Sequence, residues 1–192
     1  TMTATTTAYD PRAGRRSLFQ ALTQARARHG GKTPILVDVD ERVLDYDTLL
    51  KGVLALGHAL KRGTAKGEHV GVMLPTGAAA AITFFGVSAY GRVPAMLNFT
   101  SGSANILSAL RTAQVKRVVT ARRFVGIAKL EELVAEIAGV AEIVYLEDVR
   151  AKLGLMDKAA AATGLFAPGL VAAKADPGST AAILFTSGTE GA

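Results

Sequence analysis

The carboxyl-terminal end of the chain carries the residues best suited to chemistry. The segment 180–185, TAAILF, is a short apolar run typical of a buried strand, and it is followed by Thr186, Ser187, Gly188, Thr189, Glu190 and Gly191. Glycines let the backbone approach an anion closely, successive N–H groups form a concave nest, and hydroxyls can bind phosphate oxygens or magnesium. In an open α/β sheet such a loop lies at the carboxyl end of its strand, where ligands bind. These residue types indicate a phosphate-binding loop.

A polar turn after a core strand is the simpler alternative, because turns built from small residues are common. The loop also lacks the nucleotide-binding pattern in which a glycine precedes Gly-Lys-Ser/Thr by five positions. The only Gly-Lys-Thr is 31–33, and the residue five positions before Gly31 is Arg26. Glu190 adds a carboxylate that phosphates would repel unless it turns away or meets a metal. Spacing alone therefore leaves both interpretations open.

Composition fits one sizeable α/β core. The chain has 192 residues, of which 49% are hydrophobic and 20% charged, and it contains no cysteine. This excludes disulfides, thiolate metal sites and cysteine nucleophiles, and it suits a reducing, cytoplasmic location. Residues 1–16 are Thr-rich without the apolar segment of a signal peptide, so we expect a mobile arm. No apolar run reaches the length of a membrane span.

The remaining elements must position the loop, and they alternate between strand and helix patterns. Residues 34–38 and 43–44 predict a small hairpin, followed by a helix ended by Gly63. Four pairs of a strand and a helix then follow. The strands are predicted at 69–74, 93–97, 117–120 and 142–146, and the helices that follow them at 76–90, 103–114, through 124–137 and through 149–156. A linker over 163–179 comes after the last pair. This order predicts an α/β fold with a mostly parallel sheet flanked by helices.

The charged residues outside the loop favour structural roles. Asp38, Asp40, Asp45 and Asp47 lack calcium-loop spacing and suit turns and helix caps, and His29, His58 and His69 lack metal-ligand spacing. The net charge is +6, and five cations are close in sequence: Arg111, Lys116, Arg117, Arg122 and Arg123. An ordinary solvated face is the favoured interpretation, with an anionic membrane or an acidic protein as the alternatives. No nucleic-acid motif or aromatic interleaving accompanies them, so no nucleic-acid partner is expected.

TSGTEG after an apolar strand resembles the signature loop of the adenylate-forming superfamily, which contains acyl- and aryl-CoA synthetases, luciferases and peptide-synthetase adenylation domains. The family's loop continues with Pro-Lys-Gly, whereas this chain stops at Ala192, and some acyl-activating members carry Glu at the position of Glu190. The resemblance also covers 44–50, LDYDTLL, then 70–77, VGVMLPTG, and 91–98, GRVPAMLN. It implies that 17–192 is the amino-terminal α/β portion of an AMP-forming synthetase large domain, ending in the phosphate loop.

Two stretches are most similar to the acyl-acyl-carrier-protein synthetase half of bifunctional acylglycerophosphoethanolamine acyltransferases. They are 94–102, PAMLNFTSG, with 120–124, TARRF, and 144–148, VYLED. The resemblance implies activation of a fatty acid with ATP and Mg²⁺, then transfer to a phosphopantetheine thiol of CoA or an acyl carrier protein. It also implies a cytoplasmic enzyme, with peripheral contact to the inner face of the membrane as an option.

The resemblance assigns ATP binding to Thr186, Ser187, Gly188, Thr189, Glu190 and Gly191, with Thr189 also on Mg²⁺. The family's catalytic lysine, adenine-contacting motif and acyl pocket correspond to positions after Ala192, so it implies no catalytic residue in this chain. Residues 1–192 alone are therefore expected not to form acyl-adenylate. A non-catalytic nucleotide-binding or interaction module is the alternative function.

Overall fold

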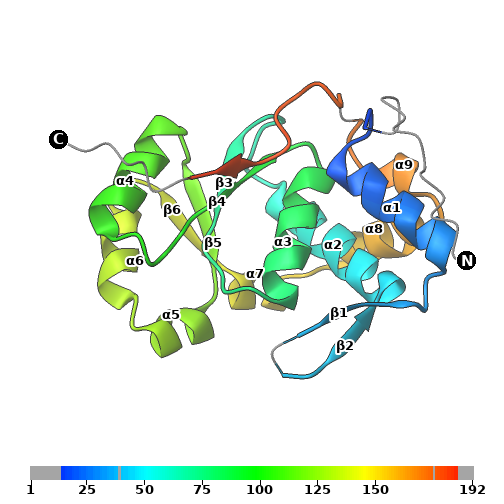
Figure 1. Cartoon of the computed structure of the whole chain (residues 1–192), viewed down its shortest axis with the longest axis horizontal. Coiled ribbons are helices and arrows are strands. Elements are labelled where there is room, and N and C mark those ends of the chain that lie inside the picture. The colour runs from blue at the N-terminus through cyan, green and yellow to red at the C-terminus, as the bar shows by residue number, and fades with distance from the viewer. Residues whose placement is uncertain (1–13, 39, 175, 186–192) are drawn as a thin grey trace, which may run out of the picture.

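The computed structural model describes residues 14–38, 40–174 and 176–185, and its centre is a five-stranded parallel sheet (Figure 1). The strand order is β6-β5-β3-β4-β7. The strands are β3 (His69–Val72), β4 (Val93–Met96), β5 (Arg117–Thr120), β6 (Glu142–Tyr145) and β7 (Ile183–Leu184), and every neighbouring pair is parallel. A separate antiparallel hairpin contains β1 (Pro34–Val37) and β2 (Val43–Asp45). The predicted α/β fold with a mostly parallel sheet is confirmed.

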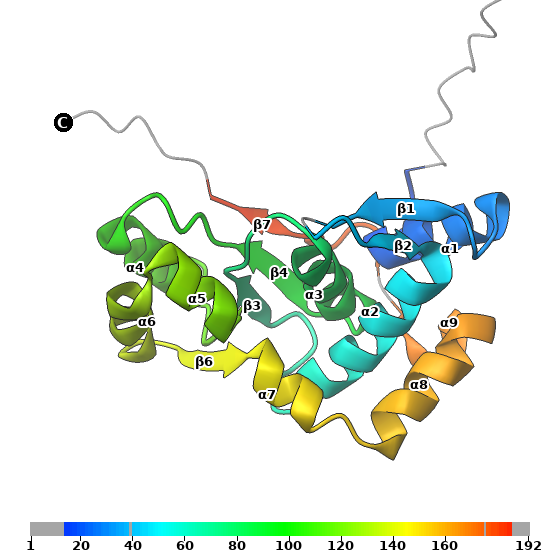
Figure 2. The ribbon, with the colours of Figure 1, turned by 90° about the horizontal axis from the view of Figure 1, so that it is seen from below.

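Helices cover both faces of this sheet (Figures 1 and 2). On one face lie α4 (Ser103–Thr112), α5 (Arg122–Ala128) and α6 (Glu131–Ala138), and on the other lie α2 (Tyr46–Leu60), α3 (Ala78–Ala89) and α7 (Leu146–Ala151). Successive strand residues point to opposite faces, so Val118 packs in the first core and Val119 in the second. Both are fully buried. Burial on both faces explains why the strands are continuous apolar runs.

A further layer packs on the side of α2 away from the sheet. It contains α1 (Leu18–His29), α8 (Leu155–Phe166) and α9 (Pro168–Val171), and its core joins Phe19 and Leu22 of α1 to Leu54 of α2 and Leu165 of α8. Helices α2 and α3 approach each other closely at Gly57, where a Cβ atom would lie 2.4 Å from the carbonyl oxygen of Gly86. Only glycine permits this contact without moving the two helices apart.

The predicted capping role is confirmed for Asp45 and Asp38, whereas the contacts of Asp47 are with cations. Asp45 caps α2, since its Oδ1 accepts a hydrogen bond from the N–H of Thr48 at 2.7 Å. Asp38 of the hairpin caps α3 from a distant part of the chain by accepting from the N–H of Ala78 at 3.1 Å. The Oδ1 of Asp47 accepts from Nε of Arg26 at 2.7 Å, which ties α2 to α1.

Three predicted segments differ from the structure. The single helix expected through 124–137 is two helices, because Lys129 adopts a left-handed conformation (φ 55°) that ends α5 before α6 begins. The helix through 149–156 is also divided, at Gly154, and the expected linker 163–179 contains the end of α8 and all of α9. Alanine dominates α8, so its sequence shows little apolar periodicity to predict from.

The last strand is shorter and more exposed than predicted. The segment 180–185 was expected to be a strand buried on both faces, whereas β7 has two residues and, within the described part of the chain, pairs only with β4 at the edge of the sheet. Ile183 and Phe185 pack against the core, while the outward-facing Leu184 is 74% exposed. An apolar run therefore does not distinguish a central strand from an edge strand.

Two expectations concern the amino-terminal arm and the membrane. Most of the predicted arm, residues 1–13, lies outside the described residues, and Gly14, Arg15 and Arg16 are exposed. Among the residues that the structure describes, no helix combines the length and the apolar character that crossing a bilayer requires.

Candidate nucleotide site at the carboxyl edge of the sheet

The structure does not describe the predicted loop residues, which are Thr186, Ser187, Gly188, Thr189, Glu190 and Gly191. It does describe the strand that precedes them. Ile183 pairs with Ala95 and Leu184 with Met96, both in parallel register. Because all five strands run the same way, β7 ends at the edge where β3, β4, β5 and β6 also end. The described chain therefore stops at Phe185 on the carboxyl edge of the sheet, where open α/β sheets bind ligands.

A polar turn follows β4 directly beside β7. The Oδ1 of Asn98 accepts hydrogen bonds from the N–H and the hydroxyl of Thr100, at 3.1 and 2.8 Å, and the hydroxyl of Ser101 donates to the carbonyl of Asn98 at 2.8 Å. Phe99 anchors the turn by an edge-to-face contact with Phe124, with ring centroids 4.9 Å apart. These residues were not predicted as site residues, although their hydroxyl and glycine content resembles that of the loop.

A cavity of about 460 Å³ lies farther along the same edge. After β3 the chain adds β4 on one side of that strand and β5 on the other, so the strand order reverses between β3 and β5. Such a switch point leaves a crevice outside the strand ends. The lining is largely apolar and includes Leu44, Leu74, Ile82, Phe124 and Leu146. The cavity thus provides room for an apolar group at the edge that carries the candidate loop.

Charged side chains surround this cavity, and its carboxylates already hold hydrogen-bond donors. Asp38 holds the start of α3 and lies 3.5 Å from a guanidinium nitrogen of Arg42, and Glu147 accepts from the N–H of Arg123 at 3.3 Å. Burial raises the pKa of Glu147, but hydrogen bonds from its own N–H and from those of Arg122 and Arg123 lower it overall. Carboxylates at the first turns of helices are favoured by the helix dipole, so these side chains act first as caps.

The predicted cluster of five cations is dispersed in the structure. Arg117 begins β5 and pairs with Glu142 at 2.7 Å, whereas Arg122 and Arg123 follow the other end of that strand. Arg122 pairs with Asp148 at 2.6 Å and Arg123 with Asp40 at 3.9 Å. Proximity in sequence therefore does not give a single basic face. The described residues also contain no group of three or more His, Cys, Asp or Glu that could hold a metal.

Comparison with known proteins identifies the family. The model of the AMP-binding enzyme family matches residues 22–192, which include nearly all of the fold and the TSGTEG loop. The chain belongs to the AMP-binding enzyme family. This match confirms the resemblance to AMP-forming enzymes at the level of the family. It also includes the TSGTEG loop, from which the resemblance was first inferred.

Solved structures of other proteins share the fold. VinN in complex with 3-methylaspartate superposes with a TM-score of 0.73 at 20% identity, covering 93% of this chain and 46% of VinN. The o-succinylbenzoate CoA synthetase of Bacillus subtilis, solved with its acyl-adenylate intermediate, gives a TM-score of 0.65 at 16% identity, with coverage of 92% and 40%. A putative long-chain fatty-acid CoA ligase of Rhodopseudomonas palustris gives 0.56 at 17%, with coverage of 67% and 31%. The chain spans less than half the length of each.

Proposed function

We propose that this chain supplies the phosphate-binding part of an AMP-forming ligase that activates a fatty acid. The observation that carries the proposal is the family match through the TSGTEG loop, combined with a fold that delivers β7 to the carboxyl edge of the sheet. The apolar cavity at the same edge is compatible with an apolar substrate. The fatty-acid class rests on the resemblance of segments 94–102, 120–124 and 144–148 to acyl-acyl-carrier-protein synthetases.

The proposed reaction has two steps. A carboxylate oxygen of the fatty acid attacks the α-phosphorus of ATP, the bond from that phosphorus to the bridging oxygen breaks, and pyrophosphate leaves. A phosphopantetheine thiol then attacks the acyl carbon and AMP leaves, giving the thioester. The backbone N–H groups and hydroxyls of 186–191 would hold the β- and γ-phosphates, so the chain contributes by positioning and by stabilising negative charge.

Magnesium would bind through ATP rather than through a cage of protein ligands. Mg²⁺ keeps several waters and is usually held by substrate phosphates with one or two protein oxygens. The hydroxyl of Thr189 is an oxygen ligand of the required type, and the described residues contain no competing cluster of carboxylates or imidazoles. When bound, the ion would neutralise charge on the departing pyrophosphate.

The thiol acceptor is proposed to be an acyl carrier protein, with CoA as the alternative. The enzyme is proposed to act in the cytoplasm, with peripheral contact to the inner membrane face as a second part of this proposal. The other candidate is a nucleotide-binding module without chemistry, because the residue types of 186–191 suit phosphate binding whether or not a reaction follows.

The test is ATP–pyrophosphate exchange by the protein that contains this chain, with straight-chain fatty acids, aryl acids and amino acids as substrates. We expect exchange with fatty acids and its loss in Gly188→Val, whose side chain would block the approach of a phosphate to the backbone. Exchange dependent on an amino acid or an aryl acid would overturn the fatty-acid class. ATP binding without exchange for any acid would favour the non-catalytic module.

A further inference from the structure

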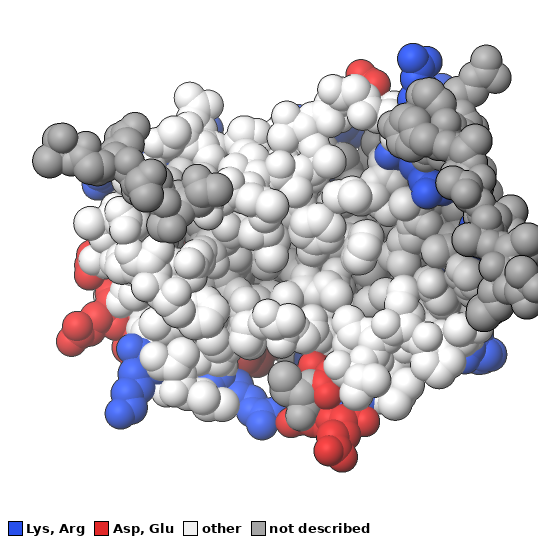
Figure 3. Space-filling model, viewed as in Figure 1, with Lys and Arg blue, Asp and Glu red and all other residues white. Residues whose placement is uncertain are grey.

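A second cavity, of about 640 Å³, lies at the opposite edge of the sheet. It is enclosed by the amino ends of β3 and β4, the start of α1, and residues 174 and 176–181, which precede β7. In the view of Figure 3, lysine and arginine side chains gather at the upper right, next to the start of α1. Neither the family match nor the structures of similar fold assign a role to this cavity.

Glycine at position 91 brings two lysines of this cavity together. Gly91 has a φ of +76°, and its carbonyl accepts a hydrogen bond from the N–H of Gly67 at 2.7 Å, which holds the adjacent Lys66 against it. The N–H of Ala173 donates to the carbonyl of Ala89 at 2.8 Å. A Cβ atom on Gly91 would lie 3.1 Å from Cβ of Ala173 and 3.8 Å from Cγ of Lys66. Lys66 and Lys174, the neighbour of Ala173, therefore line one cavity from separate parts of the chain.

Three of the cations that line this cavity have no acidic partner among the described residues. Within the part of the chain that the structure describes, Lys66, Lys174 and Arg16 form no ion pair, and Arg16 donates instead to the neutral side chain of Gln24 at 2.7 Å. The carboxylate among the described lining residues is Asp176, which accepts from the N–H of Gly178 at 2.8 Å. Three cations without an ion-pair partner and one carboxylate leave an excess of positive charge around this cavity, which attracts anions.

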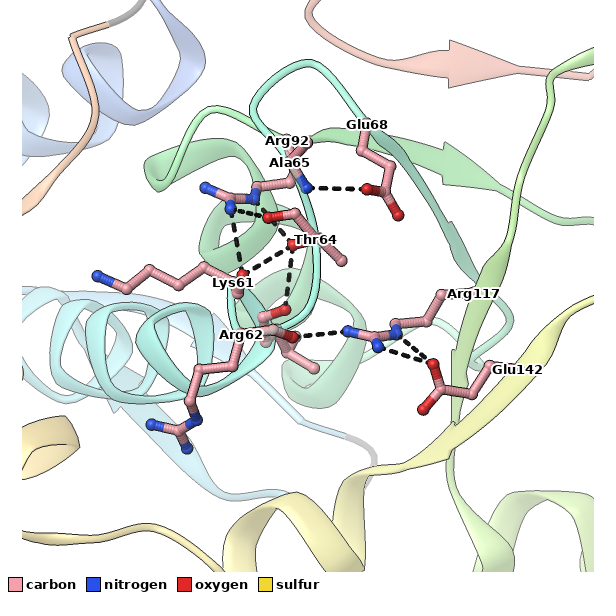
Figure 4. A network of polar contacts seen from close by, with 9 residues as sticks. Lys61, Arg62, Thr64, Ala65, Glu68, Arg92, Arg117 and Glu142 are labelled. Carbon is pink, nitrogen blue, oxygen red and sulfur yellow. Dashed lines mark hydrogen bonds and ion pairs between the residues drawn. The ribbon is translucent and has the colours of Figure 1, made fainter.

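Arg92, at the same edge, has a structural role instead. It also lines the cavity, but its guanidinium donates to the carbonyls of Tyr90, Lys61 and Thr64 and to the hydroxyl of Thr64. Figure 4 shows its contacts with Lys61 and Thr64. Its hydrogen-bonding capacity is thus used within the protein, whereas that of the two lysines is not.

Two further polar side chains of the cavity also have unused hydrogen-bonding capacity. The hydroxyl oxygen of Ser88 is buried and has no hydrogen-bond partner among the described residues, although buried hydroxyls normally have one. His69 places its Nδ1 2.6 Å from the carbonyl of Ala113, so Nδ1 carries the proton and Nε2 remains for other contacts. Rotation of the Ser88 side chain toward the cavity would let an oxygen of a ligand provide the missing partner.

We propose that this cavity binds an organic phosphate. A phosphate group provides two negative charges and three acceptor oxygens, which match the ammonium groups of Lys66 and Lys174 and the hydroxyl of Ser88. The volume is typical of sites for small organic ligands and far exceeds that of phosphate alone, and Leu18, Val93 and Pro177 provide apolar contacts for an organic group. The proposal does not depend on the proposed function, because residues 186–191 follow the opposite edge of the sheet.

The experiment is a titration of the ¹⁵N-labelled chain, followed by amide chemical shifts, with phenyl phosphate as the probe. Phenol tests the need for charge and inorganic phosphate the need for the organic group. We expect shifts at Gly67, Gly91 and Ser179, and affinity for phenol and inorganic phosphate lower by a factor of about 10 or more. The double variant Lys66→Glu, Lys174→Glu should lose at least about 10-fold in affinity, whereas Lys51→Glu, Lys158→Glu, on exposed helix surfaces outside the cavity, should not.

Two further variants distinguish binding in this cavity from binding at the TSGTEG loop and from a purely structural role of Ser88. Ser88→Ala should raise the Tm of the free chain, because an unsatisfied buried hydroxyl is removed, and should still weaken phenyl phosphate binding by a factor of about 3 or more. Thr186→Ala, Thr189→Ala should leave the binding unchanged. The proposal is overturned if the amides of Gly67, Gly91 and Ser179 do not shift, or if shifts occur only at 186–191. It is also overturned if phenol binds as well as phenyl phosphate. A lysine or serine variant that keeps full affinity and an unchanged circular dichroism spectrum would overturn it as well.

Discussion

The two edges of the sheet use charge in opposite ways. At the amino edge, arginines bind the carbonyls that follow the end of α2: Arg92 donates to Lys61 and Thr64, and Arg117 donates to Arg62 at 2.8 Å (Figure 4). At the carboxyl edge, carboxylates bind the N–H groups that begin helices, as Asp38 does for α3 and Glu147 for α5. The pattern follows the helix dipole, with cations at helix ends and anions at helix starts.

The two edges also differ in how strongly their polar contacts tie neighbouring elements together. The amino-edge arginines connect α2 to the starts of β4 and β5, through partly buried contacts of Arg92 and more exposed contacts of Arg117. The carboxyl edge is held by helix caps and exposed ion pairs, and it retains the switch-point cavity and the end of β7. We infer that the polar contacts at the amino edge contribute more to stability than those at the carboxyl edge, although a cavity for a ligand lies at each edge.

The largest effect is expected from Arg92→Met. This change removes a partly buried guanidinium whose pKa burial lowers, and leaves the carbonyls of Tyr90, Lys61 and Thr64 without their donors. Unsatisfied buried groups cost about 1–3 kcal/mol each, so a loss of about 3 kcal/mol in unfolding free energy is expected. Urea unfolding followed by circular dichroism measures it. Arg111→Met, an exposed arginine of α4, is the control with little change, and equal losses in the two variants would contradict the role given to the amino edge.

The second effect is pH-dependent and concerns Asp157 of α8, which is 1% exposed. Its carboxylate contacts Nη1 of Arg62 at 2.8 Å and Nδ1 of His58 at 2.7 Å. Burial raises the pKa of Asp157, but these hydrogen bonds and that from Gly154 lower it to about 2, from an ordinary 3.8. Because the folded-state pKa is lower, the stabilisation is complete above pH 3.8 and is lost as the pH falls through 2.

Asp157→Asn should therefore lower stability at pH 7 by about 2 kcal/mol, and the difference from the unmodified chain should shrink toward pH 2. Thermal and urea unfolding at several pH values between 7 and 2 measure this difference. Glu136→Gln, at an exposed position of α6, is the matched control with no such dependence. A difference that stays constant over this range would show that the carboxylate is not held in its charged form by α2.

A smaller effect is expected at the carboxyl edge. Asp38→Ala removes the cap of α3 and should cost about 1 kcal/mol, the usual value for a lost N-terminal cap. Asp40→Ala, in the same hairpin but with a distant and exposed partner, should cost less. The amide shift of Ala78 reports the bond directly. If removing Asp38 destabilised the chain as much as removing Arg92, the contrast between the two edges would fail.

How much the sequence predicts depends on whether the determining contacts are local. The parallel sheet, the hairpin and the Asp45 cap were predicted because apolar periodicity and capping act within a few residues. For Asp38, the sequence predicted a capping role but not the helix that it caps, because its partner Ala78 is 40 residues away. The break at Lys129 has no sequence signal, since a left-handed lysine is unusual.

The same distinction applies to the candidate sites. The TSGTEG loop is a continuous segment and was recognised from its residues, and the family match includes it. Both cavities are assembled from segments far apart in sequence, such as Lys66 with Lys174, or Leu44 with Leu146. Residue types alone could not bring these segments together. In the same way, the five cations between 111 and 123 are neighbours in sequence but not on one surface.

The smallest effect is expected for the ion pair of Arg122 with Asp148, which lies at the carboxyl edge beside β6. The pair is bidentate, at 2.6 and 2.7 Å, and the guanidinium lies 4.1 Å from the centre of the Tyr145 ring. A hydrogen bond to Asp148 raises the pKa of Arg122, and the same bond lowers the pKa of Asp148. Both side chains are about half exposed, however, at 52% and 50%. Solvent and salt screen such pairs, so good geometry does not make this contact an important source of stability.

A double-mutant cycle with Arg122→Ala and Asp148→Ala isolates the coupling between the two side chains. We expect a coupling smaller than any of the three effects above, and a further decrease when the salt concentration is raised. Repeating the cycle with Tyr145→Leu separates the ring contact, which depends less on salt than the ion pair does. A coupling as large as the loss in Asp157→Asn, or one insensitive to salt, would mean that this pair is effectively desolvated. The carboxyl edge would then be held by strong polar contacts, as the amino edge is.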